Sequence, residues 1–532
     1  MEFKNAVLLL FICVLCFQLS HGAKILGIFP MPAKSHYTLG NSLMRGLAEA
    51  GHDVTMISPH NDKVPTRNGS YRNVVLTGFA DSYEAAMKRA NPFEKSHSNS
   101  FRYLLLFQKQ ITILIEKTFE NPNVKELLNS DETFDIVIVE QITNEAFKYF
   151  AHHFKAHLVM FSSIAADSKI NYVVANPTMI SYTPLVDTDF SREMSLYQRI
   201  HNFLLYINEA IIYRYHWLPF QNTLLQKYFP GSPSMLELNY NVSLVLVNSH
   251  ESIQPAIPLV PNMIPIGGFH INKPKSLPQD LQKYLDEATE GVVYASFGSS
   301  VKAKSLPNDK KEALLKTFGS VKEKVLWKWE GDEIKNLPSN VKTAKWFPQR
   351  EILAHPNVKL FITQGGLLSL TETIYNGVPV LVIPIFGDQA MNAQMVISNG
   401  YGLSLPFHDP EFSDEKLTPI LKELLSNPKY KDNALKRSQI FHDREMDPLQ
   451  KAVYWIEYVI RHNGAPQLRV WGVNLPWYQL YSLDVIGILV TIIGLIFIFI
   501  YIIIKYLLSF ITKKNSDIKY KQSKGTKKIK KN

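Results

Sequence analysis

Short runs of apolar residues alternate with longer segments of helical periodicity along most of the chain. Runs of this length predict buried strands, and the segments between them predict helices. Strands that alternate with helices are typical of a parallel, doubly wound α/β sheet. The first half has six strand candidates, at residues 24–29, 52–58, 73–77, 135–139, 157–161 and 244–247. Its first helix is predicted over residues 41–50, with Gly51 as its end.

The alternation pauses once and then starts again. Residues 255–282 begin with a stretch rich in proline and glycine, and we interpret them as a linker. Two α/β halves that face each other across a cleft hold a ligand at the carboxyl ends of their strands. After the linker, strands are predicted at 291–297, 325–329, 359–363 and 380–383, and helices at 308–318, 367–375, 388–398 and 414–425.

Two helical segments of the first half are rich in aromatic residues, at 101–119 and 194–229. Ordinary helical packing would explain both segments. An apolar pocket for an acceptor, or contact with a membrane surface, would also produce this composition. The sequence leaves these alternatives open.

Both ends of the chain carry an apolar segment. Residues 1–22 have the three parts of a secretory signal peptide: a positively charged first segment, a short apolar segment and a cleavage site with small residues. An uncleaved membrane anchor is the alternative. Residues 485–504 carry no charge, and as a helix they would be about 30 Å long, which predicts one transmembrane helix. Aromatic residues precede this span and a basic tail, residues 505–532, follows it. This order predicts a single-pass type I protein with a cytoplasmic tail and a lumenal body.

Short motifs near these segments suggest a compartment. Lys528 and Lys530 are the fifth and the third residue counted back from the end, which resembles the dilysine retrieval signal of endoplasmic-reticulum membrane proteins. A general attraction to anionic lipid is the alternative. Asn68 and Asn241 each begin an Asn-x-Ser acceptor site for N-glycans. We therefore expect the endoplasmic-reticulum membrane.

Charge and cysteine content exclude several classes of function. The net charge is +10, but the chain from residue 505 onward holds ten lysines and one aspartate, so the rest is nearly neutral. A nucleic-acid-binding domain needs its basic face on the folded part, and no nucleic-acid partner is expected. Cys13 and Cys16, the two cysteines, lie in the predicted signal. A processed chain would therefore lack disulfides, thiolate zinc sites and cysteine nucleophiles.

A glycine pair stands between a predicted strand and a predicted helix. Gly365 and Gly366 allow the backbone to approach a ligand closely, and the free N–H groups of the following helix favour an anion such as a diphosphate. Ser369 adds a hydroxyl group, and Glu372 could accept hydrogen bonds from sugar hydroxyls. Alone, a Gly-Gly pair is most often a plain strand-to-helix turn.

The continuation of this motif is far more specific. Residues 361–389 resemble the signature of the UDP-glycosyltransferases, the UDP-glucuronosyl/UDP-glucosyl family, and are similar to insect-type members. The resemblance also covers residues 346–349, 291–299, 267–268 and 447–483, and so nearly the whole processed chain. It implies a GT-B fold of two Rossmann-like domains, here an acceptor domain (23–254) and a UDP-sugar domain (283–446). Residues 447–484 would form a helix that returns to the first domain, followed by a juxtamembrane segment.

The resemblance assigns donor contacts to ten positions. Trp346 would stack on uracil, Gln349 would form a hydrogen bond to the uridine, and Glu372 would hold the ribose hydroxyls. The diphosphate would be held by Ser299, Gln364, Gly365, Gly366 and Ser369. The hydroxyls of the donor sugar would be bound by Asp388 and Gln389. Without its neighbours, Trp346 would be read as a core aromatic residue. Gln364 departs from the histidine usual in vertebrate members. Because glutamine offers a neutral hydrogen bond and no charge, we expect UDP-glucose rather than UDP-glucuronate.

The first half is expected to supply a base, because an acceptor hydroxyl must lose its proton as it attacks. His36 follows a strand, in a loop just before a helix whose dipole disfavours imidazolium. Residues 30–51 resemble the family's catalytic-histidine loop, which implies that His36 is the base. A carboxylate should support it, and Glu140 stands where the family has aspartate. Asp135 is the rival, on the opposite face of the strand.

These assignments predict an inverting single displacement in which the helix N-terminus takes the charge of the leaving UDP. No metal or cofactor is expected. Two patterns resemble metal motifs but fit ordinary structure better: the pair Asp187 and Asp189 indicates a loop, and His157, near His152 and His153, indicates the start of a strand. The expected partners are a UDP-sugar and a small lipophilic acceptor, as in detoxification, with a homo- or hetero-oligomer possible. The alternatives are a silent relative that binds lipophilic ligands and a lumenal transferase for lipids or glycoproteins.

Overall fold

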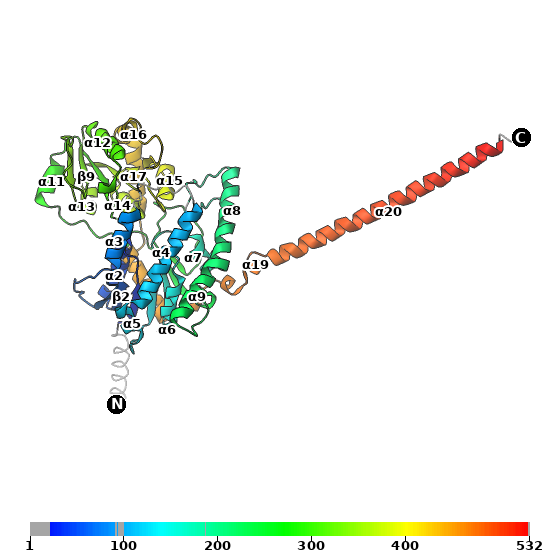
Figure 1. The fold of residues 1–532 in the computed structure, drawn as a ribbon, viewed down its shortest axis with the longest axis horizontal. Coiled ribbons are helices and arrows are strands. Elements are labelled where there is room, and N and C mark those ends of the chain that lie inside the picture. Colours follow the sequence, from blue (N-terminus) through cyan, green and yellow to red (C-terminus); the bar gives the residue numbers. More distant parts are fainter. Residues whose placement is uncertain (1–21, 91–92, 94–99, 187, 300, 530–532) are drawn as a thin grey trace, which may run out of the picture. The chain divides into compact units, whose positions relative to one another are not determined.

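The computed structural model describes residues 22–90, 93, 100–186, 188–299 and 301–529. They form two units, of which the first ends at Val470 and the second begins at Trp471 (Figure 1). The predicted signal peptide lies outside the described residues except for Gly22. Asp187, of the pair Asp187 and Asp189, also lies outside them.

The first sheet of unit 1 has seven strands, all parallel, in the order β3-β2-β1-β4-β5-β6-β7. Its central strands are buried on both faces, which explains why they read as continuous apolar runs rather than as alternating ones. The strands are β1 (Lys24–Ile28), β2 (Asp53–Ser58), β3 (Ser70–Val75), β4 (Ile136–Glu140), β5 (His157–Ser162), β6 (Val242–Val247) and β7 (Met263–Pro265).

Helices connect and cover this sheet. Sequence signals explain several boundaries: Asn121 caps α5 ahead of Pro122, and Ser195 with Gln198 forms a capping box at the start of α8. The helices are α2 (Lys34–Glu49), α3 (Phe79–Ala90), α4 (Ser100–Glu120), α5 (Pro122–Leu128), α6 (Tyr149–His153), α7 (Ser168–Val173), α8 (Leu196–Ile212), a π-helical turn (Tyr213–Trp217), α9 (Leu218–Tyr228) and α10 (Met235–Tyr240).

The second sheet has six parallel strands in the order β10-β9-β8-β11-β12-β13. Its strands are β8 (Val292–Ser296), β9 (Lys324–Lys328), β10 (Val341–Ala344), β11 (Val358–Thr363), β12 (Val380–Val382) and β13 (Gly402–Ser404). Its helices are α11 (Gln279–Asp286), α12 (Asn308–Gly319), α13 (Gln349–Leu353), α14 (Leu367–Asn376), α15 (Gln389–Ser398), α16 (Asp414–Ser426) and α17 (Pro428–His442). Each sheet therefore carries the strand order 3-2-1-4-5-6 of a Rossmann domain.

The structure corrects the sequence prediction at three places. The expected linker contains β7, which pairs with β6 and completes the first sheet. The helix expected from residue 41 begins at Lys34, so His36 lies in its first turn and not in a loop. The short strands β10 and β13 were not predicted.

One helix returns from the second domain to the first. It is α18 (Pro448–Arg461), which starts sharply because Asp447 accepts hydrogen bonds from the backbone N–H groups of Leu449 and Gln450. Ala452, Ile456 and Val459 are fully buried against the first sheet, in one cluster with residues of β1, β4 and β6. The core of the first domain is therefore completed by residues from the end of unit 1.

A second contact joins the domains from the other direction. Phe93, which lies between α3 and α4, is 3% exposed and belongs to the core of the second domain. Its ring lies 6.1 Å from that of Phe297 and 4.7 Å from that of Phe407. Glu84 of α3 also forms an ion pair with Lys302 of the second domain. These contacts hold the two domains together.

Unit 2 consists of the short helix α19 (Trp477–Leu480) and the long helix α20 (Leu483–Ile529). By length and composition, α20 is long and apolar enough to cross a membrane within residues 483–523. Its apolar side chains from Val485 to Ile504 are exposed to the surroundings. The predicted span at residues 485–504 lies inside this helix.

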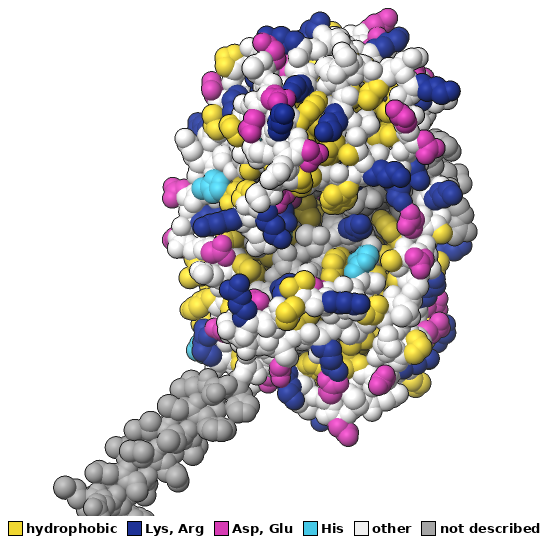
Figure 2. Space-filling view, turned by 90° about the vertical axis from the view of Figure 1, so that its left-hand side faces the viewer, with side chains coloured by type: hydrophobic (Ala, Val, Ile, Leu, Met, Phe, Trp, Pro, Cys, Tyr) yellow, Lys and Arg dark blue, Asp and Glu magenta, His cyan; other side chains and the backbone are white. Residues whose placement is uncertain are grey.

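Lys and Arg side chains are interspersed with Asp and Glu on the face of the molecule drawn in Figure 2. Hydrophobic side chains appear among them in small groups. This mixture fits the sequence, in which the excess of positive charge lies after residue 504.

Candidate functional site

His36 and Glu140 meet at the point where the strand order of the first sheet reverses. β1 and β4 are neighbours in the sheet, with Ile28 opposite Val139, so the chain segments that follow these strands lie together. The Nδ1 atom of His36 lies 2.5 Å from Oε1 of Glu140, whose side chain is fully buried. Because a carboxylate only accepts hydrogen bonds, Nδ1 is the donor, and Nε2 is left to accept a proton.

The environment of His36 raises its pKa above the ordinary histidine value. Burial by itself would lower this pKa, but the charge of Glu140, the hydrogen bond to it and the charge of Asp388 together raise it. The net shift in the pKa is therefore opposite to the shift that the dipole of α2 alone would produce. A carboxylate at 2.5 Å outweighs the partial charge of a helix end.

A buried polar cluster fixes the loop that follows Glu140. Asn144 donates to the backbone oxygen of Glu140 at 2.9 Å. Glu145, fully buried, accepts hydrogen bonds from four side chains, which balance the cost of burying its charge. The four donors are Gln141, Tyr213, Trp217 and Gln221, at 2.9 to 3.1 Å. The π-helical turn supplies two of them, and it therefore helps to place the end of β4.

The second sheet presents a glycine turn at its own point of reversal, between β8 and β11. Gly365 has a φ of +88°, and a Cβ atom there would lie 2.6 Å from Cγ1 of Val382, so only glycine fits without strain. Gly366 precedes α14 and no side chain caps this helix. Its first N–H groups therefore point toward the turn, as an anion site requires. Ser299 lies half-buried in the loop after β8, the neighbouring strand.

Gln349, Ser369 and Glu372 form one cluster beside this turn. The Nε2 atom of Gln349 donates to Oε2 of Glu372 at 2.7 Å and to Oγ of Ser369 at 3.2 Å. Burial raises the pKa of Glu372 to about 7, although Gln349 and Arg350 lower it. The carboxyl group thus titrates near neutral pH, and it can exchange its bond to Gln349 for hydroxyl groups of a ligand.

Asp388 and Gln389 lie at the start of α15. Asn392 holds Asp388 by donating to its Oδ2 at 2.8 Å, and it donates to the backbone oxygen of Gly365 at 2.9 Å. The side-chain oxygen of Gln389 accepts from the backbone N–H groups of Ile385 and Phe386. Gln389 therefore keeps only its amide N–H groups for a ligand. Gln364, at the end of β11, is buried.

The two halves of the site face each other. The Nζ atom of Lys34, two residues before His36, lies 5.5 Å from the ring centroid of Trp346. Nζ of Lys328 lies 4.9 Å from the same ring and donates to the backbone oxygen of Gly298 at 2.6 Å. Trp346 is 63% exposed, so it is not the core aromatic residue that the sequence alone would suggest. Through Lys328, the ring is connected to the turn that follows β8.

The family follows from a comparison with known proteins. The family model for UDP-glucoronosyl and UDP-glucosyl transferase matches residues 23–521. The chain belongs to this family. UDP-glycosyltransferase UGT5 of Dactylopius coccus is 37% identical over 524 residues, which are 96% of each chain. UDP-glucuronosyltransferase 2B17 of Rattus norvegicus is 31% identical over 513 residues, which are 92% of this chain and 93% of the relative.

The predicted family resemblance is thereby confirmed, and membership implies a UDP-sugar donor and an acceptor. Solved structures confirm the GT-B fold. Spinosyn forosaminyltransferase SpnP matches with a TM-score of 0.55 at 18% identity, over 83% of this chain and all of that one. The glycotransferase of kitacinnamycin matches with a TM-score of 0.54 at 16% identity, over 82% and 99%. With α20, the family membership indicates association with a membrane.

Other residues considered from the sequence lie elsewhere in this UDP-glycosyltransferase. Asp135 precedes β4, where its Oδ2 accepts from the backbone N–H of Lys24, at the opposite end of the strand from Glu140. His153 contacts the backbone oxygen of Leu128, and His157 begins β5. Among the described residues, no three His, Cys, Asp or Glu side chains gather as metal ligands would.

Sequence reasoning missed the lysines and the cluster around Glu145. Lys328 is a charged residue within an apolar strand, and that irregularity was a usable signal. Lys34 gave no signal, because its contact with Trp346 exists only once the domains face each other. The buried carboxylate of Glu145 reads as a surface residue in the sequence.

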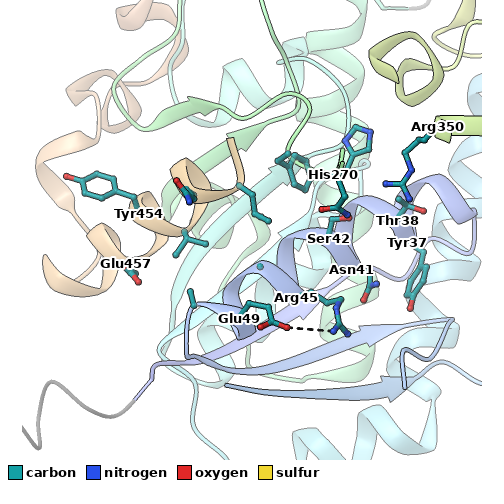
Figure 3. Close-up of a pocket in the computed structure, with 17 residues that line it drawn as sticks. Tyr37, Thr38, Asn41, Ser42, Arg45, Glu49, His270, Arg350, Tyr454 and Glu457 are labelled. Carbon is teal, nitrogen blue, oxygen red and sulfur yellow. Dashed lines mark ion pairs between the residues drawn. The ribbon is translucent and has the colours of Figure 1, made fainter. Parts of the chain in front are cut away.

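A cavity of about 740 Å³ lies where α2, α18, the linker and α13 come together (Figure 3). His270 is 3% exposed, and neither ring nitrogen has a hydrogen-bond partner among the described residues. Burial and the charge of Arg350 lower its pKa to about 3, so its ring is neutral. In Figure 3, His270 and Arg350 lie at the same end of the cavity as Thr38 and Ser42 of α2.

Proposed function

We propose that the protein transfers a hexose, with glucose preferred, from a UDP-sugar to a hydroxyl group of small lipophilic acceptors. The reaction would be an inverting single displacement that needs no metal. The observation that carries this proposal is the 2.5 Å contact between His36 and Glu140, placed opposite the donor residues. A base that is held by a buried carboxylate and faces a glycine-turn anion site has the parts that such a transfer requires.

The proposed donor contacts follow the clusters already described. Trp346 would stack on uracil, because its side chain is largely exposed and an indole suits this geometry. Glu372, released from Gln349, would accept hydrogen bonds from the ribose hydroxyls, and Gln349 would bond the uridine. Ser299, Gln364, Ser369 and the turn formed by Gly365 and Gly366 would hold the diphosphate, and Asp388 with Gln389 would hold the sugar hydroxyls.

The proposed reaction moves one proton and exchanges one bond. The acceptor hydroxyl would give its proton to Nε2 of His36, while its oxygen forms a bond to the anomeric carbon. The bond from that carbon to the UDP oxygen would break on the opposite face, so the configuration inverts. Glu140 would stabilise the imidazolium ion, and the N-terminus of α14 would stabilise the charge on UDP.

The donor preference rests on Gln364. Its side chain is buried and carries no charge, so it offers nothing to neutralise the carboxylate of glucuronate. A neutral hexose needs no such partner. We therefore place glucose ahead of glucuronic acid.

The proposed location is the endoplasmic-reticulum membrane, with the body in the lumen and a single type I span. A signal peptide at residues 1–22, the basic residues after α20 and the lysines near the end support this arrangement. Glycans at Asn68 and Asn241, and a role in conjugating lipophilic compounds, belong to the same proposal.

Microsomes that contain the protein test the proposal. UDP-glucose and UDP-glucuronate are offered separately with a panel of phenols and hydroxylated lipophiles, and products are identified by mass and by the configuration of the new bond. We expect β-glucosides from UDP-glucose, unchanged by a chelator, and loss of product with His36→Ala. Equal product from the wild type and His36→Ala would remove the base assignment.

Two alternatives give different results in the same assay. A silent relative, which the changes at Glu140 and Gln364 could produce, would bind UDP but release no product. A transferase for lipids or glycoproteins would modify microsomal components and leave the small acceptors unchanged.

A further inference from the structure

Helix α8 and the π-helical turn after it expose a continuous apolar surface, here called the α8 stripe. Large hydrophobic side chains recur at spacings of three and four, which places them on one face of the helix. Their exposed fractions run from 43% to 75%. The α8 stripe consists of Leu196, Tyr197, Ile200, Phe203, Leu204, Ile207, Ile211 and Tyr215.

The distribution of polar and apolar residues on α8 differs from that of an ordinary surface helix. Its buried positions include Asn202 and Tyr206, and the Asn202 amide donates to the backbone oxygens of Ile180 and Thr183. Glu209, the carboxylate of this helix, is held by Lys169 at 2.5 Å and by the hydroxyl of Ser168. A helix normally buries its apolar face and exposes its polar face. In α8 the buried polar groups are hydrogen-bonded, while eight large apolar side chains of the helix and the turn after it are exposed together with Arg199, His201 and Asn208.

A patch of this size on one helix marks a contact with an apolar partner, because soluble surfaces rarely expose so many large side chains together. The stripe lies outside the proposed donor and base residues, none of which belongs to α8. Arg199 is exposed on the same helix and can reach phosphate groups at its border. An apolar face with a bordering cation and no free carboxylate is typical of a helix that lies in a lipid interface.

The chain itself favours a lipid bilayer as the partner of the α8 stripe. α20 is a candidate membrane span, and only residues 471–482 separate it from the end of unit 1. Twelve residues reach at most about 40 Å when fully extended. A bilayer that holds α20 therefore remains within this distance of the body, and no other apolar phase is covalently tied to it.

We propose that the α8 stripe inserts into the membrane interface, so that the body has a second contact with the bilayer that does not span it. The helix would lie in the plane of the membrane, with its apolar face at the boundary between headgroups and acyl chains. This inference rests on membrane anchoring by α20 and is independent of the proposed transfer reaction.

Fluorescence quenching in nanodiscs tests the proposal on the full chain. Cys13 and Cys16 are the two cysteines, so a variant with both replaced by serine accepts one reporter at a time. An environment-sensitive fluorophore is attached to Phe203→Cys or Ile207→Cys. The matched control is Val64→Cys, a 62% exposed apolar position on a loop of the same domain. Nanodiscs that hold one copy of the chain remove contacts between copies.

Quenchers at known depths give the expected result. A nitroxide at carbon 5 of the lipid chain should quench the reporters at 203 and 207 more strongly than a nitroxide at carbon 12, and aqueous iodide should quench them weakly. The reporter at Val64 should show the reverse, with strong quenching by iodide. This pattern would place the α8 stripe in the interface.

Two other patterns would overturn the proposal. Free access of iodide to positions 203 and 207 would show that the stripe faces water. Protection from both iodide and lipid nitroxides would show that protein covers it, either another copy or a partner.

A charge variant adds a second measurement. Phe203→Glu combined with Ile207→Glu should reduce lipid quenching of a reporter at Ile200→Cys several-fold, whereas Asn208→Glu, a change at an exposed polar position of the same helix, should leave it unchanged. UDP binding by both variants should match the parent chain, which shows that the fold is intact. Equal quenching in both variants would contradict insertion of the stripe.

Discussion

Replacing Glu140 by glutamine separates the charge of this side chain from its shape. Glutamine fills the same space and can still contact Nδ1 of His36, but it carries no negative charge. The carboxylate is fully buried and lies 2.5 Å from the imidazole, which is one-quarter exposed, so solvent screens the pair only in part. In the proposed transition state the imidazole is positively charged, and the lost interaction is then at its strongest.

The expected loss can be worked from this geometry. A hydrogen bond to a charged group contributes about 1.5–3 kcal/mol. Losing about 2–3 kcal/mol of transition-state stabilisation lowers kcat/KM roughly 30- to 150-fold. Asp135→Asn is the matched control, because Asp135 is an exposed carboxylate at the far end of the same strand, and kcat/KM should stay near the wild-type value.

The pH profile gives a second, independent readout. A base must be neutral to act, so activity falls as the pH drops through the pKa of His36. Burial lowers this pKa and Glu140 raises it; without the charge of Glu140, the lowering by burial dominates. The acidic limb of kcat/KM should therefore move to lower pH in Glu140→Gln. UDP release measured from about pH 5 to pH 9 covers this range.

One combination of results would refute the reasoning. If Glu140→Gln keeps kcat/KM within a few-fold of the wild type and its acidic limb does not move, the carboxylate does not act through His36. The same pair also affects stability. Because the folded-state pKa of His36 is raised, the pair stabilises the fold below the ordinary histidine pKa, and this contribution is lost as the pH rises through the folded value.

Three further predictions concern the donor half and the domain contact. Burial raises the pKa of Glu372 to about 7, so UDP affinity should increase as the pH rises through that value, and titration calorimetry should find no such dependence in Glu372→Gln. Gly365→Ala should destabilise the protein to urea more than Gly387→Ala does: both positions have positive φ, costing about 1–2 kcal/mol, but only the first meets a neighbouring side chain. Phe93→Ala should lower the free energy of unfolding by about 3–5 kcal/mol, and Val64→Ala should change it little; similar values for both would show that Phe93 does not join the domains.

The sequence predicts the fold class because buried parallel strands leave a clear apolar signal. The strands missed, β10 and β13, have only three or four residues, and most of their positions are half-buried. They therefore lack the continuous apolar run that marks β4 or β11. β7 was not predicted, because the prolines and glycines around it indicate a loop.

The candidate site could be predicted only as separate pieces. The ends of predicted strands identified His36 and Glu140, but no sequence pattern gives the strand order that makes β1 and β4 neighbours. Contacts across the cleft, such as Lys34 with Trp346, depend on the arrangement of two domains. The start of α2 was placed too late, because its N-cap, Ala33, offers no capping side chain and two prolines just before it indicate a loop.

The return of α18 to the first sheet has a consequence for biosynthesis. A ribosome completes the first sheet early, yet Ala452, Ile456 and Val459, which seal one face of it, emerge almost at the end of unit 1. At the usual rate of translation, a delay of roughly 10 to 40 s separates β7 from α18. During that delay this apolar face of the nascent domain is covered by α2 but not yet by α18. The amino-terminal domain is therefore synthesised first and completed last, when α18 has been translated.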